Sequence, residues 1–229
     1  MSYKVILLDF DDTIVDFHDA EIKAYAYLMD QYQVPKHLHN YEQFKAINQA
    51  HWEAFQRGEL SREEVLSFRF IETFKHYNMS IDGKKADMTF REGLANAPIK
   101  LLEGVEDLLA YTQHQFVLAI VTNGVKETQH KRLNQMNIKS KMQHIFISDE
   151  LGVQKPKVAF FDKVFNMMSE YTKKDFMIVG DSLTSDIQGG INAGIDTCWF
   201  NHRQLDNHSG IEPTYTITHI KELVEILKK

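Results

Sequence analysis

The stretch Val5-Ile6-Leu7-Leu8-Asp9-Phe10-Asp11-Asp12-Thr13 decides the fold, because a short apolar run passes directly into a group of acidic residues. Four aliphatic residues in a row, 5–8, are typical of a strand buried on both faces of a parallel sheet. Ligands of such sheets bind beyond the carboxyl ends of the strands. Because side chains alternate along an extended chain, Asp9 and Asp11 are expected on the same side. The stretch therefore predicts an α/β fold with a functional site at these two carboxylates.

Four later apolar runs have the same character as the first, and most of them are followed by a helical pattern. They cover residues 116–122, 143–147, 176–179 and 197–200. Strands that alternate with helices form a parallel sheet with helices on both faces. We therefore expect a Rossmann-like, doubly wound parallel sheet as the core of the protein.

The region between the first and second apolar runs has a different pattern, since its apolar residues recur at helical spacing. Asn40 and the pair Ser61 and Glu64 have the spacing of helix caps, and Asp82 precedes a further helix after a turn. We predict that residues 16–96 form an inserted α-helical cap domain, and that 1–15 and 97–229 form the core. Most phenylalanines and methionines of this insertion are expected inside its helix packing, and a few are expected to face the cleft that the insertion covers.

Composition and charge exclude several classes of protein. The 229 residues are 43% hydrophobic and 25% charged, which suits a globular chain. The formal net charge of −6 disfavours a nucleic acid polymer as partner. Cys198 is the single cysteine, and no apolar run reaches membrane length or resembles a signal-peptide core, so a cytoplasmic protein without membrane attachment is expected. The sequence leaves the oligomeric state open, and a monomer is compatible with it.

Two motifs after the insertion offer groups that bind anions. Thr122-Asn123-Gly124 follows the second apolar run and supplies a hydroxyl, backbone N–H groups and a glycine that lets the backbone approach a phosphate. The same three residues would also suit an ordinary strand-to-helix turn. Pro156 disfavours a helical conformation for Lys155, so this lysine is predicted to be a fixed cation.

A fourth motif, Gly180-Asp181, follows the run 176–179. Asp181 lies directly after that predicted strand and is interpreted as a ligand of a divalent metal. Asp186 lies where the next helix is expected to begin, so it would interact with the helix dipole or support the metal site. Each motif is a modest signal, but all four lie at strand ends, where an open α/β sheet assembles its site.

In this order, the motifs resemble those of the haloacid dehalogenase-like phosphohydrolases. Residues 9–13 match the DxDxT loop of the family, Thr122 its second motif, Lys155 its third, and Gly180-Asp181 with Asp186 its fourth. The insertion resembles the helical cap of the first subfamily. Residues 189–201 are similar to bacterial members regarded as pyrimidine 5′-nucleotidases. The resemblance covers essentially the whole chain.

The resemblance implies a Mg²⁺-dependent phosphomonoester hydrolase that acts on a small soluble phosphometabolite, in first place a nucleoside 5′-monophosphate. Asp9 would be the nucleophile that forms an aspartyl-phosphate, and Asp11 the general acid and base. Mg²⁺ would bind to Asp9, to Asp181 and to the backbone carbonyl of Asp11. Phosphoryl oxygens would bind to Thr122, the Asn123 N–H and Lys155, while Asp186 would orient the metal ligands or Lys155.

Other functions stay open at this point. A phosphoglycolate or sugar phosphatase and a phosphosugar mutase of the same family would use the same aspartate pair, whereas Asp11 disfavours dehalogenation. A phosphoacceptor signalling domain would combine similar groups, although the large insertion favours catalysis. A binding module that has lost catalysis is the least favoured reading. Phe17 and Trp52 would either stack on a nucleobase or pack inside the cap, and His18 is expected to be exposed.

Overall fold

The computed structural model describes residues 3–136 and 138–228. The chain forms two compact units, one made of Met1–Phe17 and Ile99–Lys229 and one made of His18–Pro98. We call them the sheet unit and the helical unit. The boundaries expected from the sequence were 15/16 and 96/97, and the units divide at 17/18 and 98/99. The helical unit is thus inserted into the sheet unit along the chain.

The sheet unit is built on a six-stranded sheet with the order β3-β2-β1-β4-β5-β6, in which all neighbouring strands are parallel. The first strand has neighbours on both sides, because Leu8 is opposite Ile120 of the second strand and Val179 of the fourth. The strands are β1 Val5–Leu8, β2 Val117–Thr122, β3 His144–Ile147, β4 Phe176–Gly180, β5 Asp196–Phe200 and β6 Tyr215–Ile217.

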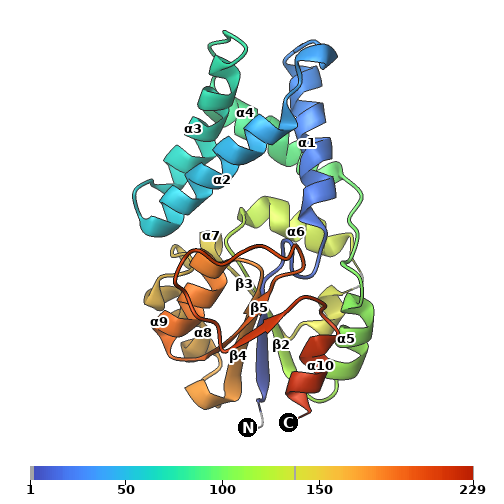
Figure 1. Ribbon diagram of the computed structural model, residues 1–229, viewed down its shortest axis with the longest axis vertical. Helices are drawn as coiled ribbons and strands as arrows, with labels where there is room; N and C mark the ends of the chain where they lie inside the picture. The colour runs from blue at the N-terminus through green and yellow to red at the C-terminus, as the bar shows by residue number, and fades with distance from the viewer. Residues whose placement is uncertain (1–2, 137, 229) are drawn as a thin grey trace. The chain divides into compact units, whose positions relative to one another are not determined.

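Helices cover both faces of this sheet (Figure 1). On one face, Ile6 and Leu8 belong to a buried cluster with residues of α5, α6 and α10, and on the other, Val5 and Leu7 pack with residues of α8 and α9. The helices are α5 Val105–Thr112, α6 Lys126–Asn134, α7 Ser148–Leu151, α8 Val158–Met167, α9 Gln188–Ala193 and α10 Glu222–Leu227. Short 3₁₀ turns are Lys139–Lys141 and Lys173–Asp175, and Leu183–Ile187 is a π-helical turn. The doubly wound parallel sheet predicted from the sequence is confirmed.

The five strands expected from apolar runs are all present, but the sequence analysis missed β6. This strand has three residues and pairs only with β5. Tyr215 is half-buried, Thr216 is exposed and Ile217 is buried. An edge strand of that length carries too little apolar pattern to be recognised.

The helical unit contains α1 Phe17–Gln31, a 3₁₀ turn Lys36–Leu38, α2 Tyr41–Arg57, α3 Arg62–Lys75 and α4 Gly83–Asn96. Two of the expected caps are confirmed, because the side chains of Asn40 and Ser61 accept hydrogen bonds from backbone N–H groups of the following helices. Asp82, predicted only as part of a turn, caps α4 in the same way. Phe44 lies 5.9 Å from Phe70 between ring centroids, and such aromatic contacts form the centre of the unit.

Most phenylalanines of this unit are buried, as expected, but some apolar helix residues are exposed. Phe68 is 44% exposed and Met88 is 63% exposed, whereas the neighbouring Arg69 is buried at 3%. The helix α3 therefore turns a charged side chain inward and a phenylalanine outward. An internal ion-pair network, described below, stabilises this arrangement.

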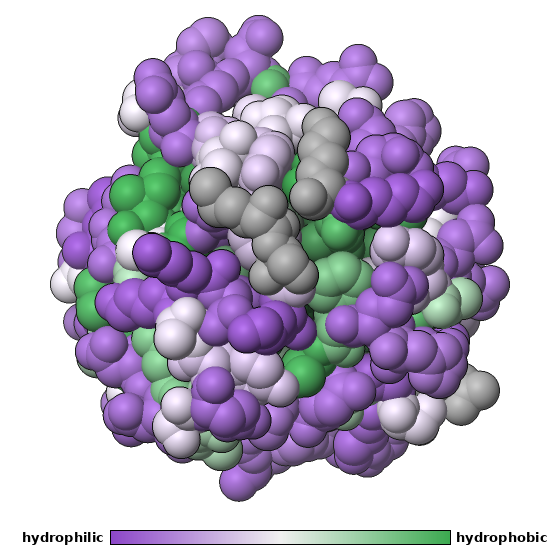
Figure 2. Space-filling view, turned by 90° about the horizontal axis from the view of Figure 1, so that it is seen from below, coloured by the Kyte–Doolittle hydropathy of each residue, from purple (hydrophilic) through white to green (hydrophobic). Residues whose placement is uncertain are grey.

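Seen from below, the molecule displays mainly hydrophilic residues with small hydrophobic areas between them (Figure 2). Among the described residues, no helix is both long enough and apolar enough to cross a membrane.

Candidate active site

The carboxyl ends of neighbouring strands bring the predicted motifs together in the sheet unit. Asp9 follows β1, and its N–H donates to the carbonyl of Val179 in β4 at 2.9 Å, which prolongs the strand pairing by one residue. Thr122 ends β2 on the other side of β1. Because the sheet is parallel, the groups that follow these strands lie at one edge.

Three carboxylates form the centre of the site. Oxygen atoms of Asp9, Asp181 and Asp186 all lie within 4.8 Å of one another. Burial raises the pKa of Asp9 to about 8, the Lys155 ammonium opposes this shift, and the Asp186 and Asp11 carboxylates add to it. The pKa of Asp181 is raised well above its ordinary value, first by burial and then by Asp12 and Asp9. Like charges at this spacing and burial favour the binding of a cation.

Lys155 is the cation at this centre and is 1% exposed. Its Nζ donates to Asp9 Oδ1 at 2.6 Å, to Asp186 Oδ1 at 2.6 Å and to the carbonyl of Val121 at 2.7 Å. Burial acts to lower the pKa of Lys155, but the Asp186 and Asp9 carboxylates outweigh burial and raise it above its ordinary value. All three N–H groups of the ammonium are thus used, which fixes its position.

Asn123 holds the loop that carries Lys155. Its Nδ2 donates to the Lys155 carbonyl at 2.9 Å, and its Oδ1 accepts from the Lys155 N–H at 3.0 Å. The peptide bond between Lys155 and Pro156 is cis. The side chain of Asn123 therefore acts within the protein, and only its backbone N–H corresponds to the phosphate-binding group expected from the sequence.

Asp186 is anchored on both oxygens. Oδ1 accepts from Lys155, and Oδ2 accepts from the Ser182 N–H at 3.1 Å. A Cβ atom on Gly180 would overlap the carboxylate of Asp186, so the glycine in this motif lets that side chain approach the strand end. The geometry brings Asp186 against Lys155 as well as against the two other aspartates.

Asp11 lies apart from this centre and faces α6. Its Oδ1 accepts from Arg132 Nη1 at 2.5 Å, and its Oδ2 accepts from Gln129 Nε2 at 2.8 Å. Gln129 Nε2 also donates to Thr122 Oγ1 at 2.9 Å. Sequence reasoning missed Gln129 and Arg132, because residues 126–134 are almost entirely polar and read as an exposed helix.

The first and fourth motifs are joined directly. Thr13 Oγ1 accepts from the Asp181 N–H at 3.1 Å, and Trp199 Nε1 donates to the Asp181 carbonyl at 2.8 Å. Asp12 has a positive φ of 57°, which an aspartate tolerates better than most residues, and it pairs with Arg203 at 2.6 Å. The sequence analysis missed Arg203, which lies outside the motifs, and it included Trp199 only in the similar stretch 189–201, without a role at the site.

The aromatic residues considered for base stacking have protein partners. The guanidinium carbon of Arg132 lies 5.4 Å from the ring centre of Phe17, and in the helical unit Arg69 lies 5.5 Å from that of Trp52. His18 is half-buried rather than exposed, and its Nδ1 lies 3.0 Å from the hydroxyl oxygen of Tyr41. Its position beside Tyr41 could not be anticipated from a helix-start pattern.

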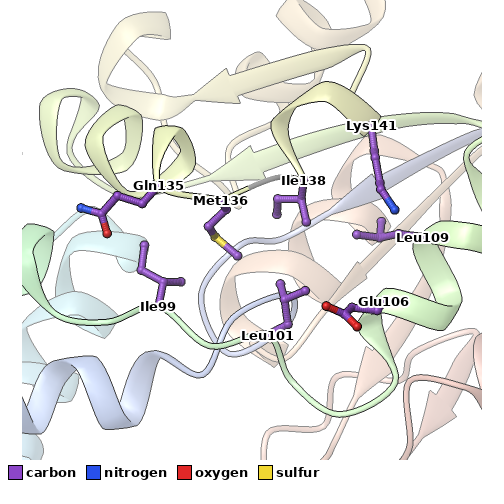
Figure 3. Close-up of a pocket in the computed structure, with 8 residues that line it drawn as sticks. All are labelled: Ile99, Leu101, Glu106, Leu109, Gln135, Met136, Ile138 and Lys141. Atoms are coloured by element: carbon purple, nitrogen blue, oxygen red, sulfur yellow. The ribbon is translucent and has the colours of Figure 1, made fainter.

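A pocket of about 370 Å³ lies elsewhere in the sheet unit, between the segment before α5, α5 itself and the end of α6 (Figure 3). Met136 points into it, and its lining contains none of the motif residues. It is lined by Ile99, Leu101, Glu106, Leu109, Gln135, Met136, Ile138 and Lys141. Because none of the residues of the four motifs lines it, this pocket is distinct from the carboxylate site.

Comparison with known proteins gives a consistent family. The sequence profile of the haloacid dehalogenase-like hydrolases matches residues 6–200. The chain is 40% identical to the HAD-hydrolase YfnB of Bacillus subtilis over 98% of this chain and 95% of that protein. It is 34% identical to the pyrimidine 5′-nucleotidase PynA of Streptococcus pneumoniae over 100% of this chain and 97% of that protein.

Solved structures agree with this result. The crystal structure of YfnB, which was determined with bound magnesium, superposes with a TM-score of 0.93 over 100% of both chains. The pyrimidine 5′-nucleotidase YjjG of Escherichia coli is a further relative, at 29% identity over 100% of both chains. The chain therefore belongs to the haloacid dehalogenase-like hydrolase family, and its relatives place it among the phosphatases of that family.

Proposed function

We propose that the protein is a Mg²⁺-dependent phosphomonoesterase that hydrolyses nucleoside 5′-monophosphates, with pyrimidine nucleotides preferred, through an aspartyl-phosphate on Asp9. The observation that carries the proposal is the position of Asp9, at the end of β1 between Lys155 and two further carboxylates. Lys155 holds Oδ1 of Asp9, and no donor among the described residues bonds to Oδ2. That second oxygen is the one we assign as nucleophile.

The donor set suits Mg²⁺. Hard cations such as Mg²⁺ prefer carboxylate oxygens, and Asp9 and Asp181 would supply them together with the backbone carbonyl of Asp11. When bound, Mg²⁺ supplies positive charge that offsets the charge of the phosphoryl oxygens. Asp186 would support this site through its hydrogen bond with Lys155.

The reaction would proceed in two displacements. Asp9 Oδ2 attacks phosphorus while the bond to the leaving oxygen breaks, and Asp11 gives its proton to that oxygen. Asp11 then accepts a proton from water as the water oxygen attacks phosphorus, which releases inorganic phosphate and restores the Asp9 carboxylate. Two smaller barriers thus replace one large barrier.

The remaining phosphoryl oxygens would be bound by Thr122 and the Asn123 N–H, while Lys155, whose three N–H groups bind protein acceptors, would contribute its positive charge. The hydroxyl of Thr122 accepts from Gly124 N–H at 3.1 Å and from Gln129, and within the described chain it donates to no acceptor. Its O–H is therefore available to a phosphoryl oxygen. Fixed donors of this kind stabilise the charge that spreads over these oxygens in the transition state.

The substrate class is drawn from the relatives. PynA and YjjG are pyrimidine 5′-nucleotidases and match this chain over its whole length, whereas the glyceraldehyde 3-phosphate phosphatase of Pyrococcus furiosus matches only 53% of it. The full-length match includes the helical unit, where substrate selectivity would lie. We therefore rank nucleotides above phosphoglycolate and sugar phosphates, and hydrolysis above phosphosugar mutation.

A substrate panel with one variant tests the proposal. Purified protein with Mg²⁺ is assayed for phosphate release from UMP, dUMP, dTMP, purine monophosphates, phosphoglycolate and hexose phosphates. We expect the pyrimidine nucleotides to give the highest kcat/KM, and Asp9→Asn to abolish turnover of all of them. Asp206→Asn, which alters an exposed aspartate of the same unit, serves as the control. Undiminished activity of Asp9→Asn would refute the nucleophile, and a sugar phosphate as best substrate would refute the substrate class.

A further inference from the structure

The side chains of Gln129 and Arg132, one helical turn apart on α6, both bind the carboxylate of Asp11. Arg132 Nη1 donates to Oδ1 and Gln129 Nε2 donates to Oδ2, so each oxygen has a donor of its own. Arg132 Nη1 also donates to Gln129 Oε1 at 2.9 Å. The three side chains form one closed network.

Arg132 is fully buried, which is rare for arginine. Its guanidinium carbon lies 5.0 Å from the ring centre of Phe10 and 5.4 Å from that of Phe17. Its Nε and Nη2 atoms are buried and have no hydrogen-bond partner among the described residues. Unsatisfied buried donors destabilise a protein, so stability alone does not explain an arginine at this position.

Gln129 links Asp11 to the phosphate-binding motif as well. Its Nε2 donates both to Asp11 and to Thr122 Oγ1, and the residue is 2% exposed. A Cβ atom on Gly124 would overlap the Gln129 amide. The glycine of the Thr122-Asn123-Gly124 motif therefore makes room for this glutamine.

We propose that Gln129 and Arg132 are positioning residues that fix the Asp11 carboxylate, and that Gln129 sets its place relative to Thr122. The proposal rests on the proposed function, in which Asp11 protonates the leaving oxygen and Thr122 binds a phosphoryl oxygen. A shift of an acid by about 1 Å is enough to lower a rate by about two orders of magnitude. In this proposal, helix α6 positions the side chain of Asp11, a role that its polar sequence does not indicate.

Leaving groups of different basicity provide the test, because an alkoxide needs protonation more than a phenolate does. In Arg132→Met and Gln129→Leu, we expect kcat for a nucleoside 5′-monophosphate to fall by about 100-fold. For p-nitrophenyl phosphate the expected loss is less than about 10-fold, with KM of both esters changed little. Arg132→Lys, which keeps a cation, should recover part of the loss.

Lys131→Met is the matched control, since it removes an exposed cation from the neighbouring position of the same helix. It should leave both rates unchanged. Circular dichroism and thermal unfolding of each variant separate misfolding from mispositioning, because misfolding lowers turnover of both esters equally. Equal losses on the two esters in folded variants, or no loss at all, would overturn the proposal.

Crystal structures of Gln129→Leu and Arg132→Met test the same proposal independently of turnover. We expect the Asp11 carboxylate to be displaced by about 1 Å or more once a donor is removed. An Asp11 that keeps its place in both variants would overturn the positioning role. Failure of the wild-type protein to hydrolyse any ester would instead refute the proposed function, and the displacement of Asp11 would still decide the positioning.

Discussion

Each of the two units contains a buried network of charged side chains. Acidic and basic groups are equal in number in the network of the helical unit, but not in that of the sheet unit. In the helical unit, two carboxylates meet two guanidinium groups: Arg69 donates to Asp87 at 2.6 Å, Arg91 donates to Asp87 at 2.7 Å, and Asn48 connects Arg69 to Glu21. In the sheet unit, aspartates outnumber the cations that contact them. The members there are Asp9, Asp11, Asp12, Asp181 and Asp186 with Lys155, Arg132 and Arg203.

The difference in charge balance indicates which of the two networks is suited to bind a cation. A balanced, hydrogen-bonded network needs no further ion, because each charge has its partner. An excess of carboxylates is destabilising by itself and is relieved by a cation or by protonation. The raised pKa values of Asp9 and Asp181 express this excess, whereas Asp87 of the helical unit forms ion pairs with both Arg69 and Arg91.

We expect the largest loss of stability when one partner is removed from the balanced network of the helical unit. Asp87→Asn keeps the shape of the side chain but leaves the buried Arg69 without its carboxylate. We expect a loss of about 3–5 kcal/mol in the free energy of unfolding, measured by urea titration. Asp30→Asn, at an exposed position of the same unit, should change it by less than about 0.5 kcal/mol. A loss below about 1 kcal/mol for Asp87→Asn would show that the network contributes little.

The effect of Mg²⁺ on thermal stability should depend on the carboxylates of the sheet unit and not on the network of the helical unit. A ligand that binds only the folded protein at 100 times its Kd stabilises it by about 2.7 kcal/mol, so Mg²⁺ should raise the Tm of the wild-type protein. Asp181→Asn should lose most of this rise, while Asp87→Asn should keep it despite its lower stability. Calorimetry with Mg²⁺ and with EDTA measures both effects. A rise of wild-type size in Asp181→Asn would contradict the assignment of the metal site.

An ion pair between the exposed Lys4 and the half-buried Asp175 is expected to change stability least, and it serves as a reference for the buried ion pairs. Lys4 and the Thr172 hydrogen bonds lower the pKa of Asp175 to about 2. Because this pKa is depressed on folding, the contribution is complete above the ordinary aspartate value and is lost as the pH falls from about 4 towards 2. Asp175→Asn should therefore reduce the loss of stability between pH 6 and pH 3 in urea titrations. An unchanged pH dependence would contradict the pairing.

The sequence predicted the parts of the site that follow buried strands. Asp9, Thr122 and Asp181 end apolar runs, and the geometry of a parallel sheet requires such positions to meet. Lys155 was identified through the proline after it, and the structure gives it three acceptors at the carboxylate centre. The proximity of these residues could be predicted because local pattern and sheet topology point to the same positions, whereas their roles in catalysis stay a prediction.

The remaining parts of both networks could not be predicted, since their burial depends on tertiary packing. Arg132 and Gln129 belong to a helix whose sequence is almost entirely polar, yet both are buried. Arg69 lies next to Phe68, and periodicity would bury the phenylalanine. A charged side chain is buried where residues of other helices or strands form hydrogen bonds or ion pairs with it. The spacing of apolar residues within one helix does not indicate where those partners lie.

The inserted unit leaves and rejoins the sheet unit at neighbouring points of the chain. The Asp16 N–H donates to the Lys100 carbonyl at 2.9 Å, and Val15 and Leu101 form an antiparallel bridge. The two points at which the insertion begins and ends are therefore held next to each other by backbone hydrogen bonds of the sheet unit itself. The sheet unit is thus continuous across the insertion point, so we expect that a module of another size could be inserted here without displacing the strand ends.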